Sequence, residues 1–153
     1  PMGDVAEELD IRLEKGDFAT VLCGSNKQMR YALELRHLCR VEAVGFTTQV
    51  ALYMDSADVL VSKPGGISIT EAGTRGVPLL LADMVGGCET RNQEFFTAHG
   101  WAESCPPADM AAAALKLLPD EKRRQDVVSA QHRDFDGLAA ERIAEAVLAR
   151  GGK

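Results

Sequence analysis

The sequence has few of the features that hold small folds together through covalent or metal bonds. Its four cysteines, Cys23, Cys39, Cys88 and Cys105, include no C-x-x-C pair, which argues against a zinc knuckle or a redox pair. They are also too sparse for a disulfide scaffold, so we expect free, buried thiols in a reducing cytoplasm. Aromatic residues make up only 5% of the chain, which predicts a core of aliphatic side chains and alanine.

Long apolar runs and an excess of basic residues are absent too. The longest apolar run, 77–82, is far shorter than the roughly 20 residues that cross a bilayer. Lys and Arg total 17 against 23 Asp and Glu, which gives a net charge of -6. An acidic chain has no counterion-release drive onto DNA or RNA, so we expect no nucleic-acid partner.

The composition that is present is that of an ordinary globular domain. Of the 153 residues, 46% are hydrophobic and 26% are charged, which is enough for a core without disulfides or metals. At this length we expect residues 1–153 to form one domain.

The hydrophobic period alternates between that of strands and that of helices. Short apolar runs predict strands at 18–23, 41–46, 58–62, a run introduced by 76–78 that ends at 82, and a weak one at 101–104. Amphipathic spacing predicts helices at 4–15, 26–38, 50–57, about 68–75, 90–99, 108–118, 120–134 and 138–150. This order predicts an α/β fold, a parallel sheet with helices on both faces. Ligands of such sheets bind beyond the carboxyl ends of the strands, so the site should follow residues 23, 46, 62 and 82.

The segment after the third predicted strand, 63–71, has the features of an anion site. Gly65 and Gly66 let the backbone approach a ligand, and the following helix directs its free N–H groups and positive dipole end to the same point. This is a way to hold a phosphate or diphosphate, although the Walker spacing is absent. A plain strand-to-helix turn, in which Ser68 and Glu71 form a capping box, explains the same residues equally well.

The segment after the fourth predicted strand, 83–93, gathers polar side chains behind the glycine pair 86–87. Glu89, Asn92 and Gln93 both donate and accept hydrogen bonds, which suits the several hydroxyls of a sugar. The alternative is a helix start with Thr90 as cap and Glu89 facing the dipole, and the local signal alone favours it.

Two other patterns carry less weight. Asp134-Phe135-Asp136 resembles a D-x-D metal motif, but it lies between predicted helices rather than after a strand. His37, His99 and His132 are isolated, and no Ser-His-Asp or Cys-His grouping is visible by spacing. The residues themselves therefore predict no metal site and no catalytic triad.

The two loop segments belong to one longer string that resembles a known family, VSKPGGISITEAGTRGVPLLLADMVGGCETRNQEFFTAHG. It resembles the donor-binding half of the monogalactosyldiacylglycerol synthase and processive diacylglycerol glucosyltransferase family. It is similar, more distantly, to the peptidoglycan N-acetylglucosaminyltransferase that makes lipid II. The resemblance covers roughly residues 4–105 and includes the earlier segments VLCGSN and VGFTTQVALYMDSADVLVS.

The resemblance implies a GT-B glycosyltransferase, with an active site in the cleft between two Rossmann-like domains. It implies transfer of a hexose from a UDP-sugar to a lipid or other hydroxyl acceptor, with inversion and without a divalent metal or other cofactor. A non-catalytic nucleotide-binding module or partner-dependent subunit of the same fold is the main alternative. A sugar epimerase, which also needs two domains, is a third option.

Carried over to this sequence, the resemblance places ten residues around the donor. They are Phe46 and Thr47 at the base, Gly65, Gly66, Ile67 and Ser68 at the diphosphate, Glu71 at the ribose hydroxyls, and Glu89, Asn92 and Gln93 at the sugar. Cys88 stands where the lipid enzymes usually carry glutamine, and a thiol is a poor hydrogen-bond partner. The identity of the sugar is therefore left open.

The resemblance also implies parts that this sequence does not contain. In the family, a strand and a glycine-rich loop precede the first helix, and Pro1-Met2-Gly3 looks like the tail of that loop. We therefore expect the first, central strand of the sheet to be missing, together with the N-terminal acceptor domain that carries the catalytic base. The chain would be a piece of a larger enzyme or a subunit that needs a partner, and it would be inactive alone.

Three expectations about partners and location follow. Besides the UDP-sugar, the partner is an N-terminal acceptor domain or a partner subunit, and a homodimer is one way to cover an incomplete sheet. Any membrane contact would be made through the missing half. The location would be the cytoplasm, at the periphery of the inner face of the membrane.

Overall fold

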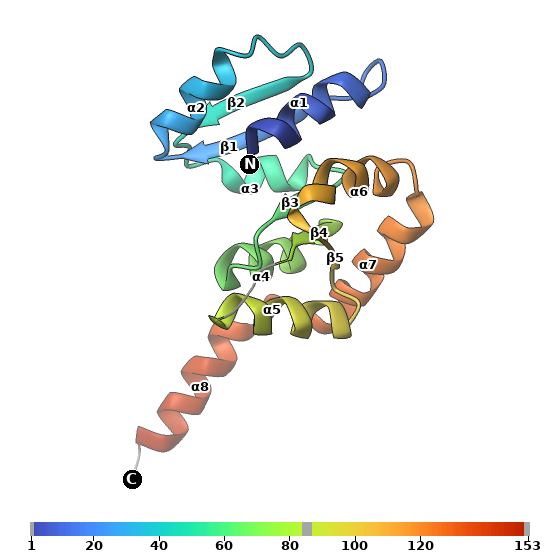
Figure 1. Cartoon of the computed structure of the whole chain (residues 1–153). Helices are drawn as coiled ribbons and strands as arrows, with labels where there is room; N and C mark the ends of the chain where they lie inside the picture. The colour runs from blue at the N-terminus through green and yellow to red at the C-terminus, as the bar shows by residue number, and fades with distance from the viewer. Residues whose placement is uncertain (1, 84–86, 152–153) are drawn as a thin grey trace.

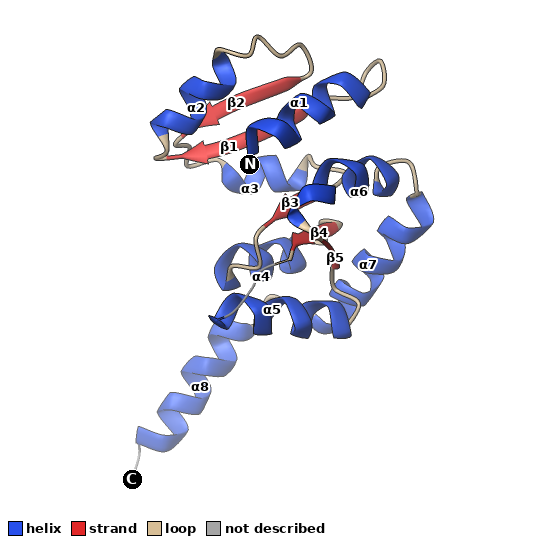
Figure 2. Cartoon of the chain, in the orientation of Figure 1, coloured by secondary structure: helices blue, strands red, loops and turns tan. Residues whose placement is uncertain are grey.

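A computed structural model describes residues 2–83 and 87–151 of the chain. Its strands are β1 (Ala19–Gly24), β2 (Val41–Gly45), β3 (Leu60–Ser62), β4 (Leu79–Ala82) and β5 (Glu103–Cys105). Its helices are α1 (Met2–Arg12), α2 (Lys27–Glu34), α3 (Val50–Asp55), α4 (Gly66–Arg75), α5 (Gly87–Ala98), α6 (Met110–Leu117), α7 (Glu121–Asp134) and α8 (Ala139–Gly151), and a 3-10 turn spans Pro107–Asp109. The predicted α/β alternation is confirmed (Figure 2).

The strands form two parallel sheets, where the sequence predicted one. β1 pairs with β2, and β3, β4 and β5 pair in that order. Within the described residues β1 and β3 do not pair with each other, so each keeps one edge without a strand partner. Strand patterns in a sequence predict strands, but the hydrogen bonding that joins them into a sheet is set by tertiary contacts.

The larger sheet is covered on both faces, and β4 carries the pattern that this requires. All four of its residues are buried. Leu79 and Leu81 pack on one side with Ile69 of α4, while Leu80 and Ala82 pack on the other side with α6. Successive strand residues point to opposite faces, so a continuous apolar run belongs to a strand buried on both.

The helix α1 packs against the cores of both sheets. Ala6 is buried with Cys23 of β1 and Leu33 of α2. Its neighbour Val5 packs against the cluster around Leu80 of β4. This helix therefore connects the β1–β2 unit to the rest of the molecule; in Figure 1 it lies beside β1 and above α6.

Of the two expectations about composition, the one about cysteines needs correction and the one about the core is confirmed. Cys23 and Cys105 are buried free thiols, but Cys39 and Cys88 are exposed, because the first lies in the turn before β2 and the second at the start of α5. The core is mainly aliphatic as predicted, except where Trp101 packs edge-on against Phe96.

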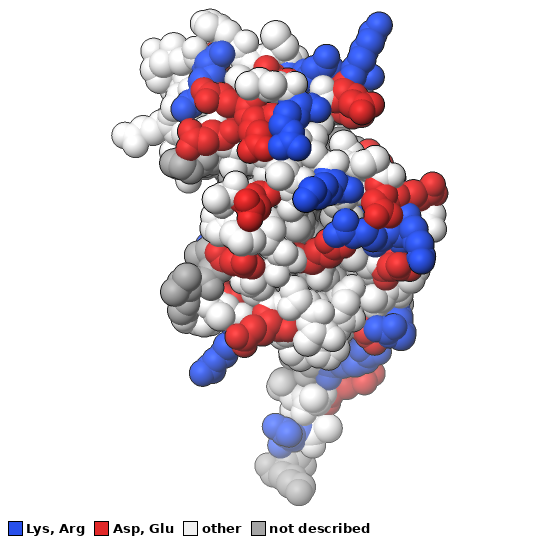
Figure 3. All heavy atoms as spheres, turned by 45° about the vertical axis from the view of Figure 1, so that its right-hand side comes forward, with Lys and Arg blue, Asp and Glu red and all other residues white. Residues whose placement is uncertain are grey.

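The helix α8 extends away from the rest of the molecule (Figure 1). Its large apolar side chains are exposed, namely Ile143, Val147 and Leu148. No helix in residues 2–83 and 87–151 is long and apolar enough to cross a membrane. Acidic and basic side chains are mixed over the face that Figure 3 presents.

Candidate functional site

The turn between β3 and α4 leaves backbone amides open at the start of a ten-residue helix. Gly65 is the N-cap, with φ −75° and ψ 123°, and its carbonyl accepts the Ile69 amide at 3.2 Å. The amides of Gly66, Ile67 and Ser68 precede that bond, and none has an acceptor within the described part of the chain. Such a helix start attracts anions, because its free N–H groups and its dipole act at the same point.

The capping box of Ser68 and Glu71 and the cap at Thr90 are wrong, whereas Glu89 does lie in the first turn of α5, where an acid faces the helix dipole. α4 begins at Gly66 rather than near 68, so Ser68 lies inside the first turn, and the N-cap makes no side-chain hydrogen bond. α5 begins at Gly87 rather than at 90, so Thr90 also lies inside a helix. Glycine can occupy an N-cap without a capping side chain, as Gly65 does for α4, so the polar residues downstream misplaced that boundary.

The fold itself does not require glycine at 65 or 66. Neither residue has a positive φ. A Cβ on Gly65 would meet Lys63 Cε at 3.7 Å and Glu89 Oε1 at 3.8 Å, and a Cβ on Gly66 would meet Asn92 Nδ2 at 3.6 Å, all ordinary contacts. Without a Cβ at these two positions, the backbone at the start of α4 is left uncovered by side chains of its own residues.

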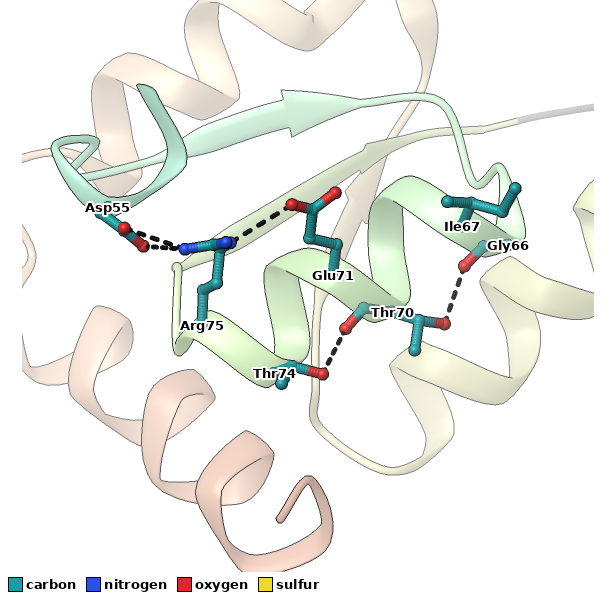
Figure 4. Close-up of a pocket in the computed structure, with 7 residues that line it drawn as sticks. All are labelled: Asp55, Gly66, Ile67, Thr70, Glu71, Thr74 and Arg75. Carbon is teal, nitrogen blue, oxygen red and sulfur yellow. Dashed lines mark hydrogen bonds and ion pairs between the residues drawn. The ribbon is translucent and has the colours of Figure 1, made fainter. Parts of the chain in front are cut away.

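An open cavity of about 780 Å³ lies along the face of α4 that follows this turn (Figure 4). Its lining residues come from that face and from the end of α3: Asp55, Gly66, Ile67, Thr70, Glu71, Thr74 and Arg75. The Ile67 side chain is 88% exposed, so it presents an apolar surface outward. Glu71 thus lies in the same cavity as the open helix start.

Three charged side chains form one wall of this cavity. Arg75 Nη1 donates to Asp55 Oδ1 at 2.7 Å and to Oδ2 at 2.9 Å, and Arg75 Nε donates to Glu71 Oε1 at 3.3 Å. The hydrogen bond to Asp55 is the main cause that raises the pKa of Arg75, and the bond to Glu71 adds to it. The guanidinium therefore stays charged, and it links α3 to the acid on α4.

The start of α5 meets the turn after β3. Asn92 Nδ2 donates to the Pro64 carbonyl at 3.0 Å, and Lys63 Nζ donates to Glu89 Oε1 at 2.7 Å. The hydrogen bond to Glu89 raises the pKa of Lys63. The structure thus brings Glu89 and Asn92 against the glycine turn, as expected for one site built from two loops.

Gln93 lies one residue further along α5, where its Nε2 donates to Asp83 Oδ1 after β4. That bond holds the helix start to the carboxyl end of the strand. The predicted loop between them includes Gly86, which lies outside the described residues.

Phe46 and Thr47 stand apart from these residues. They follow β2, which belongs to the smaller sheet, and neither lines the α4 cavity. Phe46 is 78% exposed, and Thr47 Oγ1 accepts the Gln49 amide at 3.0 Å at the start of α3. Their assignment to the nucleotide base stays a prediction.

Both aspartates of the D-x-D pattern are used in structural bonds. Asp134 accepts Trp101 Nε1 at 2.8 Å, which together with Arg133 lowers its pKa. Asp136 accepts the Leu138 amide at 3.1 Å, a bond that lowers its pKa too. No group of three His, Cys, Asp or Glu side chains that could hold a metal occurs in the described ranges.

Sequence reasoning missed four charged residues of this region: Asp55, Lys63, Arg75 and Asp83. Lys63 and Asp83 end the two strand runs that the sequence did mark, so their position was the available signal. Arg75 is four residues after Glu71, a spacing that pairs opposite charges on a helix. Asp55 had no local signal, because its contact with Arg75 depends on how α3 packs on α4.

A family model described as "Glycosyl transferases group 1" matches residues 4–134. The chain is also similar to the processive diacylglycerol beta-glucosyltransferase of Bacillus pumilus, with 34% identity over 111 residues. That match covers 70% of this chain and 29% of the relative. The chain therefore spans less than a third of that relative's length.

Solved structures give the same picture of the fold. The glycotransferase of kitacinnamycin matches with a TM-score of 0.71 at 22% identity, over 97% of this chain and 38% of that one. Anabaena HepE in complex with UDP-glucose matches with a TM-score of 0.66 at 18% identity, over 95% of this chain and 44% of that one. A UDP-N-acetylglucosamine 2-epimerase matches with a TM-score of 0.59 at 15% identity, over 97% of this chain and 46% of that one. At these identities the likeness establishes the fold alone.

Proposed function

The chain belongs to the group 1 family of glycosyl transferases, and on that premise we propose that it binds the donor, a UDP-linked hexose. The observation that carries the proposal is the open start of α4 beside a cavity that also holds Glu71. The diphosphate would accept from the amides of Gly66, Ile67 and Ser68. The glycine pair would let it come close to them.

This arrangement suits the chemistry of sugar transfer. When the bond to the anomeric carbon breaks, negative charge grows on the diphosphate that leaves. A helix start already oriented toward that charge stabilises it more in the transition state than in the ground state. The positive dipole end of α4 would thereby contribute to the rate of transfer as well as to binding.

Polar side chains around the turn would recognise the rest of the donor. A carboxylate accepts from two neighbouring hydroxyls at once, which suits Glu71 for the ribose. Glu89, Asn92 and Gln93 would read the hexose from the start of α5. The cocrystallised UDP-glucose of the Anabaena neighbour supports a UDP-sugar over other nucleotide sugars.

The acceptor and the catalytic base would come from outside this chain. Because the chain spans 29% of its Bacillus pumilus relative, we propose an N-terminal acceptor domain or a partner subunit as the source of both, with a homodimer as the other arrangement. Transfer would invert the anomeric centre and use no metal. The name of that relative supports a diacylglycerol acceptor, and the contact with the inner face of a membrane would be made through the other half.

The proposal is tested by titration calorimetry of the 153-residue chain with UDP and UDP-glucose, and with GDP- and TDP-sugars for comparison. Glu71→Ala should weaken UDP binding about tenfold or more, because it removes charge-assisted hydrogen bonds of about 1.5–3 kcal/mol. The melting temperature should fall by only about 1 °C, since the one ion pair of Glu71 in residues 2–83 and 87–151 is the surface pair with Arg75 at an i,i+4 spacing.

Glu145→Ala is the matched control, because Glu145 is an exposed acid on α8 and should leave both quantities unchanged. Equal binding of UDP by the wild type and by Glu71→Ala would contradict the role of the acid. No binding of any nucleotide sugar by the wild type would favour a different ligand for the fold.

A further inference from the structure

We propose that Arg75, held in place by Asp55, positions the Glu71 carboxylate for the two hydroxyls of the bound nucleotide's ribose. The inference rests on the proposed function, because it concerns the same cavity. It adds two residues that do not touch the diphosphate turn. It assigns them a positioning role, exerted through Glu71.

Arg75 connects the two acids, Asp55 and Glu71, along the cavity wall (Figure 4). One nitrogen of the Arg75 guanidinium contacts both oxygens of Asp55, at 2.7 and 2.9 Å, while Nε contacts one oxygen of Glu71 at 3.3 Å. The Arg75 side chain is 29% exposed, less than either acid. The planar guanidinium is thus fixed by α3 and in turn fixes the acid on α4.

The bond to Arg75 leaves the Glu71 carboxylate able to accept further hydrogen bonds. Arg75 bonds Glu71 Oε1 only, and Oε2 has no partner in residues 2–83 and 87–151. Because each carboxylate oxygen has two acceptor positions, Oε1 can accept one further hydroxyl and Oε2 another. A neighbouring pair of hydroxyls would therefore complete the carboxylate without displacing Arg75.

Ordering the Glu71 side chain before the ligand arrives would raise the affinity for the ligand. A glutamate on an open helix face samples several rotamers, and immobilising such a side chain on binding costs about 0.5–1.5 kcal/mol. If Arg75 has already restricted Glu71, the ligand does not bear that cost. The expected effect is a two- to about tenfold difference in affinity for a ribose diol.

The alternative is a purely structural role, in which the same contacts only hold α3 against α4, as a staple between the two helices. Exposed ion pairs usually contribute little to stability, so stability alone does not explain why one arginine joins two acids on a cavity wall. The two roles differ in one measurable respect. A staple affects every ligand of the cavity equally, whereas a positioning residue affects only ligands that carry the hydroxyls.

The experiment compares UDP with 2′,3′-dideoxy-UDP by titration calorimetry of the full chain. Arg75→Ala should bind UDP about two- to tenfold more weakly than the wild type, and should bind the dideoxy nucleotide as the wild type does. Asp55→Asn should show the same selectivity with a smaller loss, because Arg75 remains but is less well fixed. Arg75→Lys keeps the charge without the planar fork, and should restore binding only in part.

Arg36→Ala is the matched control. Arg36, in the turn after α2, also joins two elements through an acid, Glu7 of α1, at 2.6 Å, but it does not line the α4 cavity. It should lower stability as much as Arg75→Ala and leave both affinities unchanged. Circular dichroism melts of all variants show whether each one is folded at the temperature of the titration.

The outcomes separate this inference from the proposed function. Equal losses for both nucleotides in Arg75→Ala, or no loss for either, would overturn the positioning role while the wild type still bound UDP. A wild type that binds UDP and its dideoxy analogue alike would overturn it as well, because Glu71 would then not contact the hydroxyls. A wild type that binds no nucleotide would overturn both.

Discussion

At the scale of single residues, the glycines of this chain fall into two groups. Gly76 has φ +69°, and a Cβ there would lie 2.3 Å from His132 Nε2, so the fold itself needs glycine. Gly65 and Gly66 have ordinary backbone angles and room for a Cβ. The first kind of glycine serves folding, and for the second kind we propose a role in the approach of a ligand.

This difference predicts opposite effects of one chemical change. Gly65→Ala and Gly66→Ala should leave the melting temperature unchanged or slightly raised, because alanine restricts the unfolded chain, and should weaken UDP binding by crowding the diphosphate. Gly76→Ala should cost at least about 1–2 kcal/mol of stability through backbone strain, or about 3–6 °C in melting temperature.

Thermal melts with and without UDP measure both effects for all three variants. A loss of stability in Gly65→Ala comparable with that in Gly76→Ala would show that the turn is needed for folding. Full UDP affinity in both Gly65→Ala and Gly66→Ala would show that UDP does not bind at the start of α4.

The residues found from sequence and those missed differ in the range of the interaction that places them. Gly66 and Glu71 were predicted because a turn and the helix after it are local in sequence, and the structure places both in one cavity. Asp55 is 20 residues from Arg75, and only the packing of two helices brings them together. Long-range side-chain partners of this kind leave no periodic signal in a single sequence.

At the scale of elements, every predicted helix and strand is present, and the boundaries are where prediction failed. α4 and α5 begin two to three residues earlier than their apolar spacing indicates. Glycine interrupts a periodic pattern, so a helix that starts with glycine is read as starting later. Since the free amides of α4 belong to those first residues, the error lies at the candidate site itself.

One buried side chain joins α7 to the sheet and is a sharp test of the packing. Gln131 is fully buried, and its Nε2 donates to the carbonyls of Val77 at 3.0 Å and Trp101 at 2.8 Å. Gln131→Leu should destabilise the chain by about 2–4 kcal/mol, because two buried carbonyls lose their donor. Urea denaturation measures the change.

Gln125→Leu, on the same helix, is the control for this substitution. Gln125 is exposed, and its side chain bonds Glu121 alone among the described residues, at 2.8 Å, so its replacement should change stability by less than about 0.5 kcal/mol. If both variants lost the same stability, helix propensity rather than the buried hydrogen bonds would be responsible.

At the scale of the whole molecule, the larger sheet has a fully buried central strand and the two-stranded sheet has none. The β4 residues Leu79, Leu80 and Leu81 are at most 1% exposed, whereas most β1 residues are only partly buried. The sequence predicted both strands alike, since each is a short apolar run. It could not predict the division into two sheets, because no local pattern records which strands are neighbours.

Hydrogen exchange should reveal this division. Amides of β4 are expected to exchange only through global unfolding, and those of β1 and β2 at a lower free energy of opening, because few buried contacts hold a two-stranded sheet. Mass spectrometry of exchanged peptides from 79–82 and 19–24 measures the difference. Equal protection of both peptides would show that the sheets open as one unit, held by α1.

The unpaired edges of β1 and β3 also determine how the chain behaves in concentrated solution. Each offers main-chain donors and acceptors in a ready geometry, and such edges are where separate molecules join and precipitate. β1 is the more exposed of the two, with six residues and no proline within it. We therefore expect association of the chain in concentrated solution to begin at strand edges such as these, although its net charge is -6.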